Sequence, residues 1–393
     1  MRTETEIESK LVRGRVTSTI RGRAKRFGGR ARALLLLLVL GLGTTGPGWF
    51  DRYQGAAAQP VVAGSQAPAV DRLIALMRDP VADRGYGASP NVMPKPSGAV
   101  GVNRDFDDGR LAEPMIEEQR AGGDLVQLGL LRGRPDWRDR GWRAIEYAFR
   151  LQQPDGSFEG RRDRLHGATM FIEGAARAVV LERRLGDSAT ALAFGDDVLR
   201  TVRWILARDF QKDPEIISNG RFTHRYWIMA AALAEAAQID RQGAPAMLAV
   251  AALQARRAMA AQQDDGAFPE LGGIDVGYHA TGMVYAGRYA ALCPDPALAT
   301  AVATSVGRGG DWLGKRVLDT GDIDPSGSTR ILHERGRTGR LKGIPYGLIV
   351  QAFSAAHILT GQSGFVELGE RVLRSPGFAD YYRPSAPVRV RAD

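Results

Sequence analysis

Apolar residues recur at helical spacing along most of this chain. From about residue 112 onward the pattern is helical almost throughout, and its Ala-rich and Leu-rich segments contain few β-branched runs. The clearest helical segments are Val70–Arg78, Trp142–Gln152, Gly167–Leu185, Asp197–Arg208, Tyr226–Ile239, Leu248–Gln262, Thr281–Leu292 and Ile344–Thr360. Residues 59–111 are rich in Pro, Gly, Ala and Asp, which is typical of loops. The pattern therefore predicts an all-α domain over residues 112–393, preceded by a loop-rich lead-in.

Two segments about 110 residues apart resemble each other. Gln152–Phe158 and Gln262–Phe268 each follow a predicted helix and contain an Asp-Gly turn, where glycine can adopt the positive φ that ends a helix. The next helix opens with His166 in one copy and with His279 in the other. Self-similarity at long period indicates stacked supersecondary units, so we predict repeated helical hairpins with the two histidines at equivalent positions.

The charge of the chain is concentrated at its beginning. The net charge is +9, and the first 32 residues contribute ten Lys/Arg against three Glu, whereas the remainder carries 43 basic and 41 acidic residues. A basic segment, a short apolar stretch at 33–43 and the small residues Ala56–Ala58 resemble a secretory signal. We therefore interpret residues 1–58 as a signal peptide or membrane anchor, expect a periplasmic or secreted protein, and expect no nucleic-acid partner.

Histidines gather where loops meet helices. Four of the five histidines lie at such junctions: His166, His224, His279 and His333. The densest signal is a predicted turn at Asn219, followed by His224, Tyr226 and Trp227 and then by an apolar run. Helix N-termini attract anions through unpaired N–H groups and the helix dipole. We therefore predict that His224 lies in a site for an anionic ligand. The alternative is that this segment is only a capped helix start with aromatic residues packed beneath it.

These residues carry a resemblance to a known family. The segment His224–Trp227 resembles the Asn-His-Ser-Tyr-Trp stretch of alginate-lyase-type polysaccharide lyases, and Tyr278 with His279 resembles their downstream Tyr-His element. The Asp-Gly turns are similar to those of (α/α) toroid proteins, the architecture of that family. The resemblance implies a toroid of helical hairpins, catalytic roles for His224, Tyr278 and His279, and cleavage of an acidic polysaccharide by β-elimination. Such a reaction needs preorganised donors for the charge that develops on the uronate carboxylate.

The match to the family pattern departs at three positions. The family asparagine before the histidine is Thr223 here, so Asn219 is the nearest substitute, and a second family tyrosine is Thr281. The family arginine upstream of the tyrosine is absent. A charged loop from Asp322 to Lys342 offers a replacement, and we select Arg330 because it directly follows a turn and can hold a carboxylate with two hydrogen bonds. Asn219, Tyr226, Trp227, His166 and Arg330 are thus the predicted substrate-binding residues.

The sequence leaves two other function classes open. An inverting glycosidase would use Glu270 with Glu173 or Asp163 as its carboxyl pair. A non-catalytic protein that binds polysaccharide or assists exopolysaccharide export is the other alternative. No Gly-rich phosphate loop, nucleophile elbow or His-x-x-x-His pair is present, so we expect no cofactor and predict no metal site, although dispersed His and Asp residues leave a metal possible.

Overall fold

The computed structural model describes residues 68–88, 90, 92–101, 116–158, 163–336 and 340–383. The predicted leader, residues 1–58, lies outside the described residues. Contacts divide the chain between Gly55 and Ala56, and every described residue belongs to the second unit. Within the described ranges no helix combines the length and apolar character needed to cross a bilayer.

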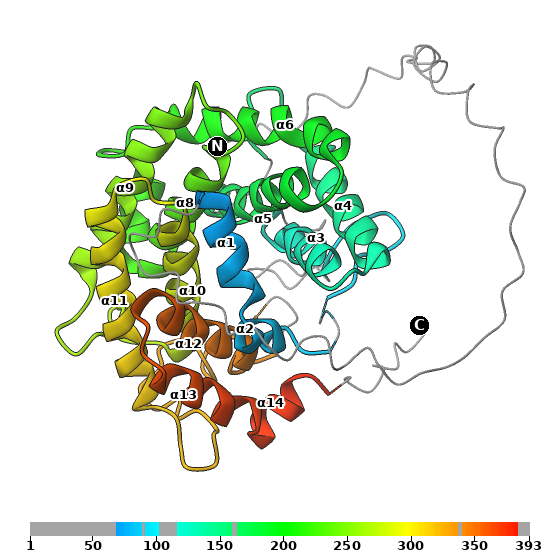
Figure 1. The fold of residues 1–393 in the computed structure, drawn as a ribbon. Coiled ribbons are helices and arrows are strands. Elements are labelled where there is room, and N and C mark those ends of the chain that lie inside the picture. The colour runs from blue at the N-terminus through cyan, green and yellow to red at the C-terminus, as the bar shows by residue number, and fades with distance from the viewer. Residues whose placement is uncertain are drawn as a thin grey trace, which may run out of the picture. The chain divides into compact units, whose positions relative to one another are not determined.

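The described part of the chain is helical, which confirms the predicted all-α class (Figure 1). Only isolated β-bridges occur among these residues, with no strand. The elements in chain order are α1 (Ala69–Arg78), α2 (Pro80–Gly85), η2 (Ile116–Arg120), α3 (Ala121–Leu131), α4 (Pro135–Phe149), α5 (Arg164–Leu185), α6 (Ser188–Leu206), α7 (Pro214–Ser218), η3 (Asn219–Arg221), α8 (Thr223–Ala236), α9 (Ala244–Ala261), α10 (Val276–Leu292), α11 (Pro296–Gly314), α12 (Tyr346–Thr360), α13 (Gly364–Leu373) and α14 (Pro376–Tyr381).

Buried and partly exposed helices alternate along the chain. Helices α5, α8, α10 and α12 are buried on nearly all sides, and each packs against the next one in sequence. Each is followed by a helix that buries only one stripe, namely α6, α9, α11 and α13. Helices α3 and α4 form a similar pair, and α3 packs against α5. A helix with apolar residues on every face must be enclosed by others, and the buried charges of this set, such as Glu173 and Arg288, are paired inside the fold.

Small residues allow the buried helices to approach closely. A Cβ added to Gly123 in α3 would collide with the backbone of Gly174 in α5. Helix α8 is built largely from alanine between Ala230 and Ala236, and these residues are buried. Short side chains at such crossings bring two helix backbones together, so the alanine content of the sequence has a packing role.

The predicted Asp-Gly turns belong to a motif that occurs four times among the described residues. The glycines have positive φ at Gly98, Gly156, Gly266 and Gly321. In each copy the glycine N–H donates to the carbonyl three residues before it, and that earlier residue donates its own N–H to the carbonyl four residues after it. Each turn precedes a buried helix, and a Cβ at its glycine would collide with an arginine carbonyl in the outer helix that follows: Arg143, Arg200, Arg308 or Arg371. The turn motif therefore also occurs at Gly98 and Gly321, where the residue before the glycine is not aspartate.

The hairpin of α8 and α9 keeps part of this motif without its glycine. Arg257 in α9 donates to the Phe210 carbonyl at 3.0 Å, as Arg308 in α11 donates to the Gln263 carbonyl at 2.8 Å.

The predicted lead-in also contributes helices to the same core. Helix α1 packs against α10, and the Arg72 Nε donates to the carbonyl of Ala291 in the last turn of α10. The segment therefore holds more helix than its loop-like composition indicates.

Candidate active site

The candidate site contains three ring-bearing side chains, each in the first turn of a buried helix. His166 belongs to α5, His224 to α8 and Tyr278 to α10. The ring centroids of His166 and His224 are 6.1 Å apart, and those of His224 and Tyr278 are 4.6 Å apart. The packing of α5 on α8 and of α8 on α10 brings these residues together from distant parts of the sequence. Three of the predicted site residues thus form one cluster.

His224 is paired with a buried carboxylate. Its Nδ1 lies 2.8 Å from Oε2 of Glu270, and the two side chains are 3% and 1% exposed. Burial lowers the pKa of His224 below its ordinary value, and this effect outweighs the attraction of Glu270. Burial would raise the pKa of Glu270, but His224 and Arg330 together outweigh it and hold that pKa below its ordinary value. At neutral pH these two directions favour a neutral imidazole beside an ionised carboxylate.

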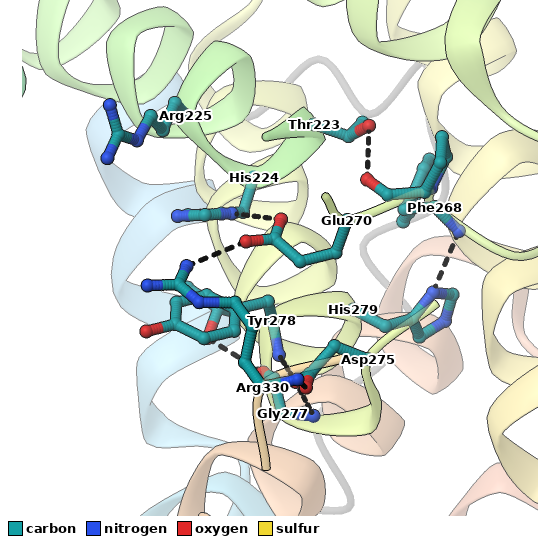
Figure 2. Close-up of polar contacts among 12 residues, drawn as sticks. Thr223, His224, Arg225, Phe268, Glu270, Asp275, Gly277, Tyr278, His279 and Arg330 are labelled. Carbon is teal, nitrogen blue, oxygen red and sulfur yellow. Dashed lines mark hydrogen bonds and ion pairs between the residues drawn. The ribbon is translucent and has the colours of Figure 1, made fainter. Parts of the chain in front are cut away.

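This ionisation state fixes the tautomer of His224. Because the Glu270 carboxylate can only accept, Nδ1 of His224 carries the proton and donates it. The Nε2 atom is left with a lone pair, and within the described ranges it has no hydrogen-bond partner. Figure 2 shows the far edge of the His224 ring, the Tyr278 hydroxyl and the guanidinium groups of Arg225 and Arg330 reaching toward the same side of the cluster.

Arg330 connects the loop before α12 to this pair. Its NH1 donates to Oε1 of Glu270 at 2.7 Å, and its other nitrogens donate to Glu334. The guanidinium carbon lies 4.0 Å from the centroid of the Tyr278 ring, a cation–π contact. The predicted substrate-binding arginine therefore joins the cluster, and its side chain is 12% exposed.

Asp275 explains why the loop and helix α10 meet in this register. Its Oδ1 accepts from the backbone N–H groups of Gly277 and Tyr278, both at 3.0 Å, and thereby caps α10. Its Oδ2 accepts from the backbone N–H groups of Arg330 at 2.9 Å and Ile331 at 2.8 Å. Asp275 is fully buried. One carboxylate therefore holds together the first turn of α10, which contains Tyr278, and the backbone of Arg330 (Figure 2).

The hydroxyl of Tyr278 has a cationic neighbour from the same loop. Lys342 Nζ donates to the Tyr278 oxygen at 2.8 Å and lies 3.0 Å from a carboxylate oxygen of Glu334. Lys342 belongs to the basic segment of the loop noted in the sequence, but its partner is decided by the fold. The Tyr278 oxygen is consequently held beside one ammonium group.

Arg225 follows His224 in α8 and makes a separate set of contacts. Its NH1 donates to Oδ1 of the predicted site residue Asn219 at 3.0 Å, and its two terminal nitrogens face both oxygens of Asp163. The Phe222 ring lies 4.1 Å from the guanidinium carbon of Arg225 and 5.6 Å from that of Arg330. Sequence reasoning missed Arg225 and Phe222 as site residues, although both adjoin the His224 motif.

The fold places three other predicted site residues away from this cluster. His279 accepts the Phe268 N–H at Nδ1 and donates from Nε2 to the carbonyl of Gly309, both at 3.0 Å, and burial lowers its pKa to about 4. Trp227 is fully buried against Phe268, and Tyr226 is half-buried with its hydroxyl near Gly220. The prediction that His166 and His279 occupy equivalent positions is wrong. Tyr278 faces His224 instead, and His279 points toward Gly309 of α11.

A second polar cluster lies farther along the same helices. Glu173 in α5 is paired with Arg177 and with Arg288 of α10, and all three are buried. Glu235 in α8 is also fully buried beside Glu173, and among the described residues neither of its carboxyl oxygens makes a hydrogen bond of normal geometry. Burial and the neighbouring Glu173 carboxylate raise the pKa of Glu235 well above its ordinary value. The surroundings of Glu235 therefore favour its neutral form inside the fold.

No group of three or more His, Cys, Asp or Glu residues suited to a metal ion occurs in the described ranges. Comparison with family models, with curated proteins and with solved structures finds no match to this chain.

Proposed function

We propose that this chain is a polysaccharide lyase that cleaves a uronate-containing polysaccharide by β-elimination. The observation that carries the proposal is the His224–Glu270 pair, because it leaves a neutral imidazole with an available Nε2 on a ring that lies against the ring of Tyr278. A buried neutral base, an acid and cationic groups for a carboxylate are the three requirements of this reaction. The proposal also rests on the resemblance of the His224 and Tyr278 segments to alginate-lyase-type enzymes.

In the proposed reaction His224 Nε2 removes the proton at C5, next to the uronate carboxylate. The electron pair left behind forms the C4–C5 double bond, and the bond from C4 to the glycosidic oxygen breaks. The Tyr278 hydroxyl donates its proton to the departing oxygen, and Lys342 stabilises the tyrosine oxygen through its hydrogen bond. Solvent then returns the proton from His224 to Tyr278, so no oxidant or cofactor enters the balance.

Negative charge on the substrate carboxylate grows as C5 loses its proton. Arg225 and Arg330 flank Phe222 and supply two guanidinium groups for that charge. Arginine binds carboxylates with two parallel hydrogen bonds, which suits a planar enolate-like group. His279 has no part in this mechanism because both of its ring nitrogens are engaged by backbone groups.

The fold that we propose for this enzyme is an (α/α) toroid. The alternation of enclosed and one-sided helices supports it, as does the contact of each enclosed helix with the next. The N-termini of α5, α8 and α10 would then open at one mouth and present His166, His224 and Tyr278 to a polysaccharide.

An inverting glycosidase is less well supported by the same residues. Its general acid would have to be protonated at neutral pH. Burial would raise the pKa of both candidate carboxyls, but His224 and Arg330 outweigh it at Glu270, and Arg177 and Arg288 outweigh it at Glu173, so both pKa values are lowered. A non-catalytic polysaccharide-binding protein remains the alternative from a different class.

The test is an assay of the purified full chain with alginate, polygalacturonate and hyaluronate. Elimination creates a conjugated unsaturated uronate, so ultraviolet absorbance should rise with at least one polymer. His224→Ala and Tyr278→Phe should each abolish the rise, while His357→Ala should retain it because His357 lies in the last turn of α12, where its Nδ1 is 3.0 Å from the Gln362 carbonyl. Release of reducing sugar without absorbance would favour the glycosidase, and binding without turnover would favour the non-catalytic protein.

A further inference from the structure

Asp163 has an unusual combination of backbone and side-chain features. It occupies the N-cap position of α5, yet its side chain makes no capping hydrogen bond to that helix. Its φ is 49°, in the left-handed region that is uncommon for residues other than glycine. Aspartate at an N-cap ordinarily accepts from the first turn of its own helix. The carboxylate of Asp163 is instead directed to a different helix.

That carboxylate faces Arg225 end-on. Oδ1 lies 3.4 Å from NH1 and Oδ2 lies 3.2 Å from NH2, the two-point geometry with which arginine binds a free carboxylate. The Arg225 side chain is only 8% exposed, whereas that of Asp163 is 56% exposed. The Nε of Arg225 is buried and has no partner among the described residues. The arginine is thus a fixed, incompletely satisfied donor, and the aspartate is its solvent-facing partner.

We propose that Asp163 occupies the carboxylate subsite of the free protein and is displaced by the carboxylate of the substrate. This inference rests on the proposed function, because it names the group that holds the uronate and the contact that competes with it. An ion pair with an exposed partner contributes little stability, so a ligand carboxylate with further contacts can replace it at small cost. Release also allows Asp163 to leave its left-handed conformation and cap α5.

The position of Arg225 makes such a replacement useful for the reaction. Arg225 adjoins His224 in sequence and shares the Phe222 ring with Arg330. A carboxylate held by Arg225 would therefore lie on the side of the cluster toward which the His224 ring edge and the Tyr278 hydroxyl reach (Figure 2). Asp163 would keep this subsite closed to weak anions until a ligand with several contacts arrives.

The experiment measures binding of sodium glucuronate to the full chain by calorimetry at low ionic strength. Asp163→Asn keeps the size of the side chain and tolerates the left-handed backbone, but it removes the competing charge. We expect it to tighten glucuronate binding by about two- to fivefold, since exposed ion pairs are worth up to roughly that factor. Asp196→Asn, an exposed aspartate on α6, removes the same charge elsewhere and should leave binding unchanged.

Arg225→Gln should lose glucuronate binding in both the native and the Asp163→Asn backgrounds. Unchanged or weaker binding by Asp163→Asn, with Arg225→Gln still defective, would overturn the displacement inference and leave the lyase proposal intact. Tightening in Asp163→Asn and Asp196→Asn alike would also overturn it, because the effect would then come from net charge. Tighter binding by Asp163→Asn in a chain with no lyase activity would support the carboxylate subsite and sink the proposed reaction alone.

Discussion

The carboxylate of Glu270 accepts a hydrogen bond from Nδ1 of His224 at 2.8 Å, and both side chains are buried. The two residues come from different helical hairpins, because Glu270 follows the turn at Gly266 whereas His224 begins α8. The neighbouring residues are also joined, since the Thr223 side chain donates from Oγ1 to the Pro269 carbonyl at 2.8 Å. Figure 2 shows this contact beside the His224–Glu270 pair.

Replacing Glu270 with glutamine should remove most lyase activity. The glutamine amide can donate to Nδ1 of His224, which would favour the tautomer with the proton on Nε2 and block the base. A comparable tautomer error in serine proteases costs about 10⁴ in kcat, so we expect a loss of about 10²–10⁴-fold. The measurement is the initial rate of ultraviolet absorbance, with thermal unfolding as a check on folding. A variant that folds normally and retains full rate would remove Glu270 from the mechanism.

The proposed base also predicts the acidic side of the pH–rate profile. Burial, the largest effect on His224, lowers its pKa, so the imidazole stays neutral to lower pH than an exposed histidine. The acidic limb of kcat/KM should therefore have its midpoint below about 6.5, the ordinary histidine value. Rates measured between mildly acidic and neutral pH test this. A midpoint at or above the ordinary value would contradict a neutral His224 as the base.

Glu235 should make the stability of the fold depend on pH. Burial and the Glu173 carboxylate raise its pKa in the folded state, so its contribution to the free energy of unfolding is fully present below the unfolded pKa of about 4.3. That contribution is lost as pH rises through the folded pKa. Glu235→Gln should flatten this fall, and its advantage over the native chain should grow with pH.

Denaturant unfolding of both chains between mildly acidic and alkaline pH measures the effect of Glu235→Gln. The control is Glu367→Gln, an exposed carboxyl on α13, which should reproduce the native pH dependence. Parallel pH profiles for the native chain and Glu235→Gln would show that Glu235 is ionised inside the fold.

The repeated turns predict a measurable difference between two glycines. Gly133→Ala should cost about 1–2 kcal/mol, because its φ is +64° but nothing lies near the added Cβ. Gly156→Ala should cost about 1–3 kcal/mol more, because the Cβ would also collide with the Arg200 carbonyl. Urea unfolding of the two variants gives the comparison. Equal losses would mean that the turn is not packed tightly against α6.

Much of the helical pattern could be predicted from periodicity alone. The expected segment Gly167–Leu185 corresponds to α5 (Arg164–Leu185), and Ile344–Thr360 corresponds to α12 (Tyr346–Thr360). The Asp-Gly sequence identified two of the four turns, those at Gly156 and Gly266. The other two were hidden because the turn requires a glycine at positive φ, whereas its neighbours vary, as at Gly98 and Gly321.

The site was only partly readable from the sequence. Local order along the chain places His224 and Tyr278 at helix starts, because a turn followed by an apolar run marks where each helix begins. The direction of each side chain depends on which neighbouring helix packs beside it, so Tyr278 faces His224 while His279 turns to Gly309. Pairings between hairpins, such as Glu270 with His224 and Asp163 with Arg225, join residues 46 and 62 positions apart. The sequence by itself determined the helices and the residue types at their ends, and only the tertiary packing decided which of them meet.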